Sequence, residues 1–444
     1  MLVEKISIVG IGKLGLCTAA CFASKGYQVI GVDVNQSTIA AVNEGRSPIY
    51  EPGLGELIIK CQGRLSATDD YKYAIRNSEV TFVIVPTPSQ DDGSFSTKYV
   101  EVAVQNIAAT LKEKKAFHVV VVTSTVMPGA TEGVIKPIFE EVSGKKSGVD
   151  FGLCYNPEFV ALGSAIRDFT NQDMVLIGES DTQPGDILTE IYRTTCSNNP
   201  YIARMSIHNA ELAKISLNAY VTMKISFANT LAELCERFPG GDVDAVTKAL
   251  GADSRIGEKY LTGAVSYGGP CFPRDNKAFV SFAKELGCKA RLSQATDEVN
   301  EDQAGRIIHM AKQEIGELGN ANIAILGVTY KPSTDVIEVS ASIDIARALL
   351  EQGAKVRIYD PVGMENARKL LGDSVTYASS IDECLHDVTL CIMATPWPEF
   401  RKLKPDDFIK KMKRPVLIDC WRVYDWAEFS TKLSYHAIGL NNRP

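Results

Sequence analysis

The sequence predicts an α/β protein with two Rossmann-like, doubly wound domains joined by a long central helix and a helical middle domain. Three observations support this fold. Strands alternate with helices in both end regions of the 444-residue chain. A glycine-rich loop follows the first strand. Residues 209–237 carry apolar side chains at helical spacing without a breaker. We expect the domains at residues 1–203, 204–317 and 318–444.

Composition narrows the class of protein. A net charge of −7 argues against a general nucleic-acid binder. The eleven cysteines form no CxxC pair, and the five histidines lack metal-ligand spacing, so we expect reduced thiols and no metal site. No apolar run approaches about 18 residues, and no signal peptide is expected. We therefore predict a cytoplasmic protein without nucleic-acid or membrane partners.

The first expected elements form a dinucleotide-binding fingerprint. A strand over residues 5–9, a helix over 16–25 and a second strand over 28–32 frame the loop. The loop reads Gly10-Ile11-Gly12-Lys13-Leu14-Gly15. A glycine hexapeptide alone is weak evidence, but this context makes a glycine turn of another α/β fold the less favoured alternative.

Each part of the fingerprint has a physical role. Gly10 allows the tight turn, Gly12 admits the pyrophosphate, and Gly15 lets the helix pack on the strand. The helix N-terminus attracts the phosphates. Asp33, which ends the second strand, can bind both ribose hydroxyls of NAD and repel the 2′-phosphate of NADP. NAD is therefore the expected cofactor.

Three further strands deliver polar loops to the same expected edge of the sheet. The strand over 80–85 leads to Thr87, the strand over 119–123 to Thr125, and the strand over 152–155 to Glu158. Carboxyl ends of parallel strands meet the cofactor in this fold. Glu158 is a candidate for acid–base chemistry, although a helix-capping or surface glutamate is equally compatible with this segment alone.

A strand over 174–177 and a helix over 186–194 precede the helical middle region. Lys214 and Asn218 are four residues apart, on an apolar face of the long helix. Such residues often snorkel or cap a loop, but here they could point into a site. Helices are expected over 243–250, 275–286 and 297–315. This region is also a plausible dimer surface.

The stretch from Tyr267 to Lys277 is the candidate reactive loop. Cys271 should lie just before a helix whose first turn contains Pro273, with Arg274 nearby. Positive partial charge and cationic neighbours favour the reactive thiolate. A buried small hydrophobe is the alternative, and it suits most of the other cysteines.

The α/β pattern restarts near residue 322. Strands are expected over 323–328, 355–359, 388–393 and 416–418, with a helix over 340–352. Gly327 is the remnant of a glycine loop, and Lys331 on the following loop is a natural phosphate ligand. We expect a second nucleotide pocket in this domain.

These pieces, in this order, resemble the UDP-glucose/GDP-mannose dehydrogenase family across essentially the whole chain. The resemblance rests on motifs spread from the first strand to the last domain. They are Gly10–Gly15 with Asp33, Pro48–Leu54, Pro86–Pro88, Ser124–Val126, Asn156–Phe159, Lys214 with Asn218, Asp253–Gly257, Gly268–Asp275 and Tyr330–Pro332.

The resemblance implies NAD-dependent, four-electron oxidation of the C6 alcohol of a nucleotide sugar to a carboxylate. Cys271 would add to the intermediate aldehyde, and the resulting thioester would be hydrolysed with Glu158 as base. The other implied site residues fall into three groups. They are Lys214, Asn218, Asp275 and Thr125 in catalysis; Gly10, Ile11, Gly12, Leu14, Gly15, Asp33, Thr87, Thr125 and Arg274 at the cofactor; and Phe159, Lys214, Asn218, Arg255, Tyr260, Gly268, Lys331 and Arg422 at the substrate.

The chain departs from the family's pattern at four places. Leu162 replaces a second glutamate, Glu338 stands for a cofactor-side arginine, and Thr38 replaces a basic residue five positions after the ribose acid. Near the C-terminus, Cys420-Trp421 replaces an expected Gly-Arg before Arg422. These departures concern the cofactor and the sugar, whereas the expected catalytic groups are intact.

Two other functions are compatible with the fold. One is a nucleotide-sugar epimerase or single-step oxidoreductase that retains its NAD; the other is a catalytically idle nucleotide-sugar sensor. A thiol placed for covalent capture has little purpose in either. The expected partners are a nucleotide-sugar substrate and a second copy of the chain, in a homodimer or higher homo-oligomer.

Overall fold

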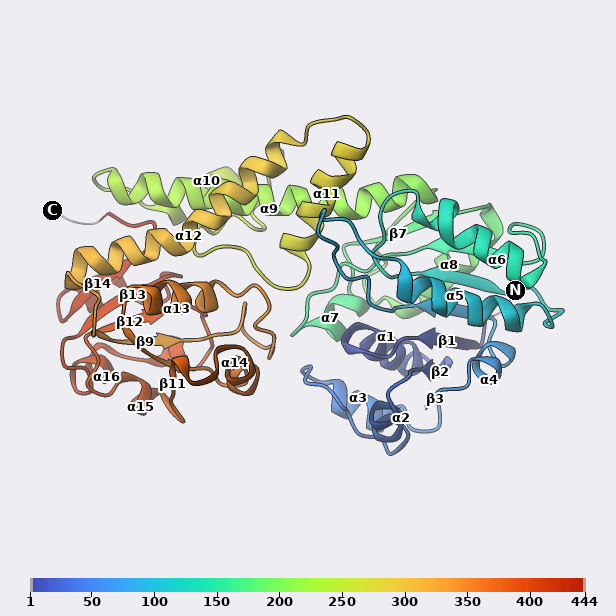
Figure 1. Cartoon of the computed structure of the whole chain (residues 1–444), viewed down its shortest axis with the longest axis horizontal. Coiled ribbons are helices and arrows are strands. Elements are labelled where there is room, and N and C mark those ends of the chain that lie inside the picture. Colours follow the sequence, from blue (N-terminus) through green and yellow to red (C-terminus); the bar gives the residue numbers. More distant parts are fainter. Residues whose placement is uncertain (1–2, 442–444) are drawn as a thin grey trace. The chain divides into compact units, whose positions relative to one another are not determined.

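The computed structural model describes residues 3–441 and divides into two compact units. The N-terminal unit ends at Ser216, and the C-terminal unit begins at Leu217. Figure 1 shows the N-terminal unit in blue to green and the C-terminal unit in light green to red. The three predicted domains, with boundaries near 203 and 317, stay a prediction.

The N-terminal unit contains a sheet of eight strands within the described residues, in the order β3-β2-β1-β4-β5-β6-β7-β8. Neighbouring strands run parallel except β6 and β7, which pair antiparallel. The central strands are buried on both faces, which explains their continuous apolar sequences. The strands are β1 (Lys5–Val9), β2 (Gln28–Val32), β3 (Leu65–Thr68), β4 (Val80–Val83), β5 (Val119–Val122), β6 (Gly152–Tyr155), β7 (Met174–Glu179) and β8 (Tyr201–Ser206).

Helices pack against both faces of this sheet. One apolar cluster joins the sheet to α1, α3, α7 and α8, and a second joins it to α4, α5 and α6. The layers follow the doubly wound pattern. The helices are α1 (Lys13–Ser24), α2 (Gln36–Asn43), α3 (Leu54–Lys60), α4 (Tyr71–Arg76), α5 (Lys98–Leu111), α6 (Lys136–Ser143), which follows a π-helical turn (Thr131–Ile135), α7 (Ala165–Thr170) and α8 (Thr182–Thr195).

The C-terminal unit contains a six-stranded parallel sheet in the order β11-β10-β9-β12-β13-β14, again counted over the residues described. Its strands are β9 (Asn322–Leu326), β10 (Lys355–Tyr359), β11 (Thr376–Tyr377), β12 (Leu390–Met393), β13 (Val416–Asp419) and β14 (Ser434–Ala437). Apolar clusters on its two faces involve α12, α13 and α14 on one side and α15, α16 and α17 on the other. Both end regions therefore have the Rossmann-like sheet that the sequence predicted.

The helical middle region is also confirmed. The long helix α9 (Ile207–Arg237) begins in the N-terminal unit and continues into the other. The remaining helices of the C-terminal unit are α10 (Val243–Ala252), α11 (Phe272–Glu285), α12 (Arg291–Ile315), α13 (Ala341–Glu351), α14 (Met364–Leu371), α15 (Ile381–Leu385), α16 (Pro405–Ile409) and α17 (Trp426–Ser430). Short 3₁₀ turns cover Gly372–Ser374 and Phe400–Lys402.

Several predicted element ends were displaced. The helix predicted from residue 186 begins at Thr182, because the Asp181 carboxylate caps it by accepting the Gln183 N–H at 3.2 Å. The helix predicted from 297 begins at Arg291. The strand predicted over 80–85 ends at Val83. These are differences of a few residues at caps and strand ends, where sequence patterns are weakest.

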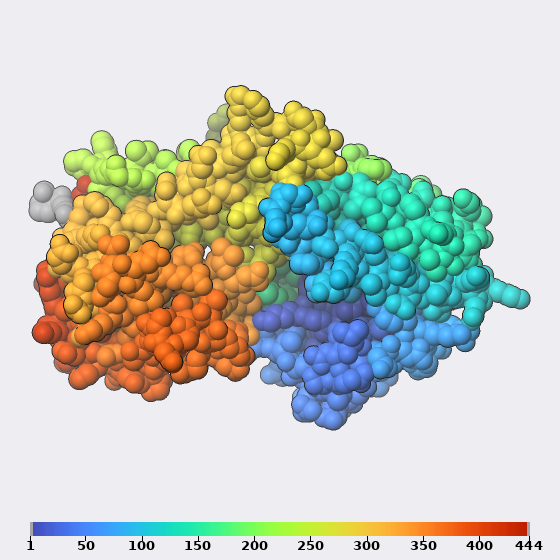
Figure 2. Space-filling model, viewed as in Figure 1, coloured from blue at the N-terminus to red at the C-terminus, as the bar shows by residue number. Residues whose placement is uncertain are grey.

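The surface of the C-terminal unit includes the turn between α11 and α12, drawn in yellow in Figure 2, where Leu286 and Leu292 are exposed. Within residues 3–441, none of the helices combines the length and the apolar character needed to cross a bilayer.

Candidate functional site

The glycine loop between β1 and α1 has the geometry that its sequence predicted. Gly10 adopts a positive φ of 89°, and its N–H donates to the Val32 carbonyl oxygen at 2.8 Å. A Cβ on Gly10 would lie 2.3 Å from the Ile84 carbonyl oxygen. A Cβ on Gly15 would lie 1.9 Å from the Gly10 carbonyl oxygen. The fold itself therefore requires glycine at these two positions.

Gly12 differs from its neighbours. It is the N-cap of α1, and a Cβ there would meet no atom within 4 Å. The open space lies at a helix N-terminus, where backbone N–H groups attract a phosphate. The protein does not fill the space that the missing side chain leaves, and this is what a pyrophosphate site needs. The loop, with Ile11 and Leu14 inside it, fits NAD.

Asp33 lies beside this loop, half-buried after β2. One carboxylate oxygen accepts the Ile11 N–H at 3.0 Å, and the other accepts the Asn35 N–H at 2.9 Å. A carboxylate can accept about four hydrogen bonds, so both oxygens keep acceptor capacity for ribose hydroxyls. The side chain is held in place while it remains able to bind a ligand.

The loops after β4 and β5 are joined at the same edge of the sheet. The Thr87 hydroxyl donates to the Thr125 carbonyl oxygen at 2.7 Å. The Ser124 Oγ accepts the Val85 N–H at 2.9 Å and lies 2.7 Å from the Val85 carbonyl oxygen. The structure thus brings Thr87 and Thr125 together, as the sequence predicted for two loops at carboxyl strand ends.

Glu158, which follows β6, is buried rather than on the surface. Tyr192 of α8 lies 3.0 Å from its Oε1, and Oε2 is buried without a hydrogen-bond partner within the described chain. Burial raises the pKa of the Glu158 carboxyl to about 7, against the opposing effects of Tyr192, Lys214 and the Phe159 N–H. A carboxyl with such a pKa can exchange a proton near neutral pH.

Lys214 contacts the main chain of this segment. Its Nζ donates to the Glu158 carbonyl oxygen at 2.6 Å and lies 4.5 Å from the centre of the Phe159 ring. The lysine is buried, with 6% of its surface exposed, so it does not snorkel to solvent. It places a cation beside Glu158 and Phe159. Its role in a catalytic or substrate site stays a prediction.

Asn218 lies one turn further along α9, in the C-terminal unit. Its side-chain amide donates to Asp275 Oδ2 at 2.6 Å, and both residues are buried. Arg274 is 3.3 Å from the other Asp275 oxygen. Asp275 is in the first turn of α11, where a carboxylate is favoured by the helix dipole. Asn218 and Asp275, which the sequence predicted separately as site residues, are therefore in direct contact.

Cys271 occupies the predicted place at the start of a helix. It is the N-cap of α11, with Pro273 in the first turn, and it is exposed. Of the eleven cysteines, only Cys271 and Cys288 are exposed; the other nine are buried. Its exposure and its place at a helix N-terminus therefore distinguish Cys271 from the buried thiols, and its reactivity stays a prediction.

The glycines before Cys271 are required by the segment that carries Lys331. A Cβ on Gly268 would lie 1.8 Å from the Val339 carbonyl oxygen, and one on Gly269 would lie 2.6 Å from the Tyr330 ring. The Gly269 N–H donates to the Glu338 carbonyl oxygen at 3.0 Å. The cysteine loop and the loop after β9 thus form one packed structure.

The predicted substrate residues of the C-terminal unit have different surroundings. Arg255 is exposed and paired with Asp253, while Tyr260 is exposed, with a positive φ of 69°, and packs edge-on against Phe272. Lys331 Nζ lies 5.7 Å from the centre of the Tyr330 ring. Their roles at a substrate stay predictions.

Arg422 is held by the protein itself. Its guanidinium pairs with Asp244 at 2.8 and 2.9 Å and donates to the carbonyl oxygens of Thr262, Gly263 and Ile438 at 2.6 to 2.9 Å. Five N–H donors are all that an arginine has. These contacts place Arg422 as a support for the segment before the cysteine loop, and its contact with a substrate stays a prediction.

Three buried side chains that contact loop segments of the N-terminal unit were not found from the sequence. Glu51 is buried and accepts the N–H groups of Gly163 and Ala165 at 2.7 and 2.8 Å. Glu211 is buried and accepts those of Gly129 and Thr131 at 2.6 and 2.9 Å. Tyr192 contacts Glu158. Glu51 stands inside a motif of the resemblance, which was the one signal for any of them.

The positions that depart from the family pattern lie in supporting segments. Leu162 is half-buried in the turn that Glu51 holds, and Glu338 is exposed. The Trp421 indole N–H donates to the Ala394 carbonyl oxygen at 2.8 Å. Thr38 lies in the first turn of α2, and its N–H is 3.4 Å from Asn35 Oδ1. Neither the Trp421 nor the Thr38 hydrogen bond involves a predicted catalytic group.

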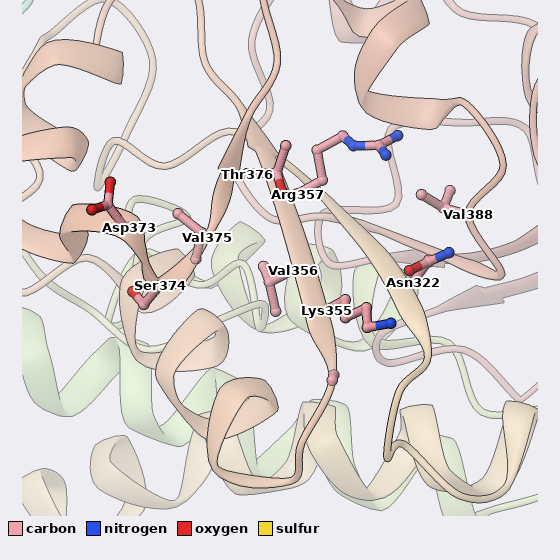
Figure 3. A pocket seen from close by; sticks show the side chains of 10 residues that line it. Asn322, Lys355, Val356, Arg357, Asp373, Ser374, Val375, Thr376 and Val388 are labelled. Carbon is pink, nitrogen blue, oxygen red and sulfur yellow. The ribbon is translucent and has the colours of Figure 1, made fainter.

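A separate cavity of about 400 Å³ lies in the C-terminal unit, lined in part by Asn322, Lys355 and Arg357 (Figure 3). Asn322 and Lys355 are the first residues of β9 and β10. Lys331 follows the other end of β9. The cavity is therefore at the opposite edge of the sheet from the loop predicted to hold the nucleotide.

Family models match most of the chain. They are described as the NAD binding domain, the central domain and the UDP binding domain of the UDP-glucose/GDP-mannose dehydrogenase family, and they match residues 4–196, 208–302 and 324–426.

Individual relatives agree with the family models. The chain is 38% identical over 422 residues to the UDP-glucose 6-dehydrogenase AglM of Haloferax volcanii, covering 94% of this chain and 97% of that one. It is 38% identical over 428 residues to the UDP-glucose 6-dehydrogenase of Rhizobium meliloti, covering 95% of each. A UDP-glucose dehydrogenase structure from Pyrobaculum islandicum matches with a TM-score of 0.90 and 35% identity, over 99% of this chain and 98% of that one.

These matches favour the predicted dehydrogenase over the epimerase or single-step alternative. The glycine loop and Asp33 have the geometry that NAD requires. The chain therefore belongs to the UDP-glucose/GDP-mannose dehydrogenase family, and it is an NAD-dependent nucleotide-sugar 6-dehydrogenase.

Proposed function

We propose that this dehydrogenase converts UDP-glucose, or a closely similar nucleotide sugar, to its uronate in two hydride transfers through an acyl intermediate on Cys271. The observation that carries this proposal is the placement of Cys271: exposed, at the N-terminus of α11, with Asp275 and Arg274 in the same turn. Two of the relatives are named UDP-glucose 6-dehydrogenases, which supports this substrate.

Cysteine chemistry separates Cys271 from the buried thiols. Burial raises the pKa of Cys21 to about 12 and that of Cys196 to about 11, so both stay protonated near neutral pH. A thiolate is the nucleophilic form, and a helix N-terminus stabilises it. Cys271 is therefore the thiol suited to attack the aldehyde formed by the first oxidation.

The cofactor residues are the glycine loop, Asp33, Thr87 and Thr125. When bound, NAD accepts the hydride that leaves the substrate carbon. Asp33 holds the ribose hydroxyls, and the Gly12 N-cap leaves space for the pyrophosphate. Arg274 is the remaining proposed cofactor contact.

The oxygen atoms of the reacting carbon need donors. Lys214 supplies a buried ammonium, and Asn218 a side-chain amide oriented by Asp275. A buried cation near a developing oxyanion stabilises it more than it would in water. We propose that Lys214 and Asn218 hold the substrate oxygen during both oxidations, with Asp275 orienting Asn218.

Glu158 is the proposed base for thioester hydrolysis. Its Oε2 is the oxygen without a partner among the described residues, so it can accept a proton from water. A pKa of about 7 keeps part of the population ionised at neutral pH and makes the carboxylate a stronger base than an exposed glutamate. The Lys214 contact to the Glu158 carbonyl holds this segment in place.

The nucleotide would be bound by the C-terminal unit. Lys331 follows β9 at the carboxyl edge of the sheet, where it can meet a pyrophosphate. Arg255, Tyr260, Gly268 and Phe159 are the other proposed substrate contacts. Arg422, also a proposed substrate contact, holds the segment before the cysteine loop through its bonds to the Thr262 and Gly263 carbonyls.

We also propose a homodimer built on α9. Tyr220, Phe227 and Leu234 are seven residues apart, and they are 57%, 52% and 58% exposed. Seven residues correspond to two helical turns, so the three side chains form an apolar stripe that a second copy could cover.

A cytoplasmic location is supported by eleven cysteines that are free thiols.

Counting reduced cofactor tests the function. The proposed reaction gives two NADH per sugar nucleotide, a single-step oxidoreductase gives one, and an epimerase or sensor gives none. A panel of sugar nucleotides should show UDP-glucose as the preferred substrate. Preference for another base or sugar would overturn the substrate while leaving the chemistry intact.

Two variants test the route. Cys271→Ser should abolish uronate formation, because a serine hydroxyl has no comparable anion at neutral pH. Cys288→Ser is the matched control, since that thiol is also exposed.

Glu158→Gln should complete both hydride transfers once and then accumulate added mass on the Cys271 peptide, because general-base catalysis contributes about 10²–10⁴-fold. Normal turnover of either variant would remove its residue from the proposed route.

A further inference from the structure

Tyr192 contacts two side chains with its single hydroxyl group. The hydroxyl lies 2.5 Å from Asn156 Oδ1 and 3.0 Å from Glu158 Oε1. Tyr192 is buried and packs against Phe22 and Phe169, with ring centroids at 6.3 and 6.0 Å. Its ring is thus held by α1 and α7 residues, and its hydroxyl is directed at the segment after β6.

The orientation of Asn156 determines where the tyrosine proton points. The Asn156 side-chain N–H donates to the Leu176 carbonyl oxygen at 2.8 Å. The amide oxygen therefore faces Tyr192, and as an acceptor it takes the hydroxyl proton. The hydrogen-bond network around the amide thus assigns the position of this proton.

A hydroxyl group has one proton, so the contact with Glu158 has two possible states. If the tyrosine proton points to Asn156, the 3.0 Å contact needs a proton on Glu158 Oε1. If Glu158 is ionised, the tyrosine proton can turn to Oε1, and Asn156 Oδ1 loses its donor. The direction of this one proton is thus coupled to the charge of Glu158.

The other oxygen of Glu158 remains available. Oε2 is buried and has no hydrogen-bond partner within the described residues. A hydrogen bond at Oε1 prevents rotation of the carboxyl group and keeps Oε2 in its position. The two oxygens are therefore inequivalent, one held by Tyr192 and one open.

We propose that Tyr192 is a positioning residue for the Glu158 base: its hydroxyl turns from Asn156 to Glu158 Oε1 when Glu158 ionises, and it holds Oε2 as the oxygen that takes the proton of the hydrolytic water. This inference rests on the proposed function. As water adds to the acyl carbon, its proton passes to Oε2. The C–S bond breaks, and its electron pair leaves with Cys271 as thiolate. The carboxylic acid product loses its proton to solvent.

Burial is the main cause of the raised pKa of Glu158, and Tyr192 and Lys214 oppose it. Lys214 of α9 is its charged neighbour. Cys21 of α1 and Cys196 after α8 also interact with it, but burial keeps their thiols neutral, with pKa values of about 12 and about 11. The hydrogen bond that can change direction is the one from Tyr192.

Tyr192→Phe tests the proposal, because it keeps the ring and removes the hydroxyl. A hydrogen bond to a charged group contributes about 1.5–3 kcal/mol, which corresponds to about ten- to a hundredfold. We expect the first two hydride transfers to persist within about twofold. Steady-state uronate release should slow about ten- to a hundredfold, its pH midpoint should rise by about one to two units, and acyl adduct should accumulate on Cys271.

Tyr27→Phe is the matched control. Tyr27 packs on the same Phe22 ring, at 6.0 Å, and its hydroxyl has no contact with Glu158 in the structure. It should retain the wild-type pH profile and show no adduct. A shift as large as that of Tyr192→Phe would attribute the effect to the aromatic cluster and overturn the proposal.

Asn156→Leu provides a second test with the opposite sign. It removes the competing acceptor, so the tyrosine proton remains with Glu158 and the pH midpoint should fall. A residue with a merely structural role would not move the midpoint in opposite directions in the two variants. The proposal is overturned if both midpoints stay at the wild-type value or shift the same way, and Asn156→Leu decides the matter if Tyr192→Phe does not fold.

The wild type separates this inference from the function on which it rests. If the wild type releases no uronate and Glu158→Gln forms no adduct, the proposed function fails. If the wild type releases uronate and the adduct forms in Glu158→Gln, unchanged Tyr192→Phe and Asn156→Leu profiles overturn the role of Tyr192 alone.

Discussion

The two sheets of this chain have the same strand order around their first strands, β3-β2-β1-β4 and β11-β10-β9-β12. The turn that follows the first strand, β1 or β9, is also the same in both sheets. Gly10 and Gly327 both have a φ of 89°, and each N–H donates at 2.8 Å to the last residue of the neighbouring strand. Beyond this shared turn the two sheets differ, most clearly in their buried carboxylates.

The carboxylate that follows the second strand differs between the two units in its burial and in the number of hydrogen bonds it accepts. Asp33 accepts two backbone N–H groups and remains half-buried, with capacity for a ligand. Asp360 is buried and accepts the N–H groups of Val328, Thr329, Val362 and Gly363, together with the Thr329 hydroxyl and the Trp397 indole N–H. The same position therefore keeps capacity for a ligand in one unit and completes the fold in the other.

A second pair of carboxylates shows the same difference in hydrogen bonding between the two units. Glu158 leaves Oε2 without a partner in the described residues, whereas Asp419, the last residue of β13, accepts the N–H groups of Trp421, Val423 and Tyr424 and the Tyr435 hydroxyl. A buried polar group that is fully hydrogen-bonded stabilises the fold, and one that is not is available for chemistry. Incomplete hydrogen bonding of the carboxylates after β2 and β6 thus distinguishes the N-terminal sheet from the C-terminal sheet, where Asp360 and Asp419 each accept several hydrogen bonds.

The largest expected effect is on folding, in Asp360→Ala. Removing the carboxylate leaves six donors without their acceptor, so the C-terminal unit should lose about 3–5 kcal/mol of unfolding free energy. Denaturant unfolding measures the change. The exposed Asp373 of the same unit is the control, and Asp373→Ala should unfold as the wild type does. An Asp360→Ala protein as stable as the control would contradict the comparison.

Asp33→Ala should affect binding rather than folding. Loss of the carboxylate that would bind the ribose should weaken NAD binding by about 1.5–3 kcal/mol, roughly ten- to a hundredfold. It should also reduce the discrimination against NADP. Titration with each nucleotide measures both. Asp150→Ala, at an exposed aspartate that also accepts a backbone N–H, should leave both affinities unchanged. Unchanged affinity in Asp33→Ala would mean that another residue holds the ribose.

The third prediction concerns pH and Glu158. Its folded pKa of about 7 lies above the ordinary value of 4.5, so between these values the folded state binds more protons than the unfolded state. The contribution of this group to stability is present below pH 4.5 and is lost as pH rises to 7, by up to about 1.4 kcal/mol per pH unit. The melting temperature should therefore fall as pH rises from 4.5 to 7. Glu158→Gln should remove this pH dependence, whereas Glu56→Gln, at an exposed glutamate, should keep it.

The same titration predicts the opposite trend for catalysis. The ionised form is the base, so thioester hydrolysis should fall about tenfold per pH unit below about pH 7. Pre-steady-state uronate release at several pH values measures it. A flat profile from pH 5 to 8 would assign the base to another group, with Asp275 the next candidate.

The smallest effect on folding is expected in Gly12→Ala. A Cβ there meets no atom within 4 Å, so the unfolding free energy should change by less than about 1 kcal/mol. NAD binding should nevertheless be lost, because the new methyl group occupies the pyrophosphate space. Gly327→Ala is the contrasting variant: its positive φ and a Cβ 2.4 Å from Thr395 should destabilise the fold. Tight NAD binding by Gly12→Ala would place the pyrophosphate elsewhere.

Much of the site could be predicted from the sequence because its signals are local. The spacing of Gly10, Gly12 and Gly15, the strand before them and Asp33 after them predicted a tight glycine turn before a helix, and the structure confirms that geometry. The expected helix after Cys271 was also confirmed, since Pro273 favours a first helical turn. The helix α5 was missed, although Val100, Val104, Ile107 and Leu111 recur at helical spacing and are buried.

The sequence by itself determined the fold class, the cofactor and the family, because apolar periodicity and glycine spacing act over a few residues at a time. Only the tertiary structure decided that Tyr192 meets Glu158 from 34 residues away, and that Glu51 holds Gly163 from 112 residues away. It also decided which carboxylates keep an oxygen without a hydrogen bond and which accept hydrogen bonds at both oxygens. Proton affinity depends on burial and on the donors that reach a group in space, and neither is written in the spacing of residues along the chain.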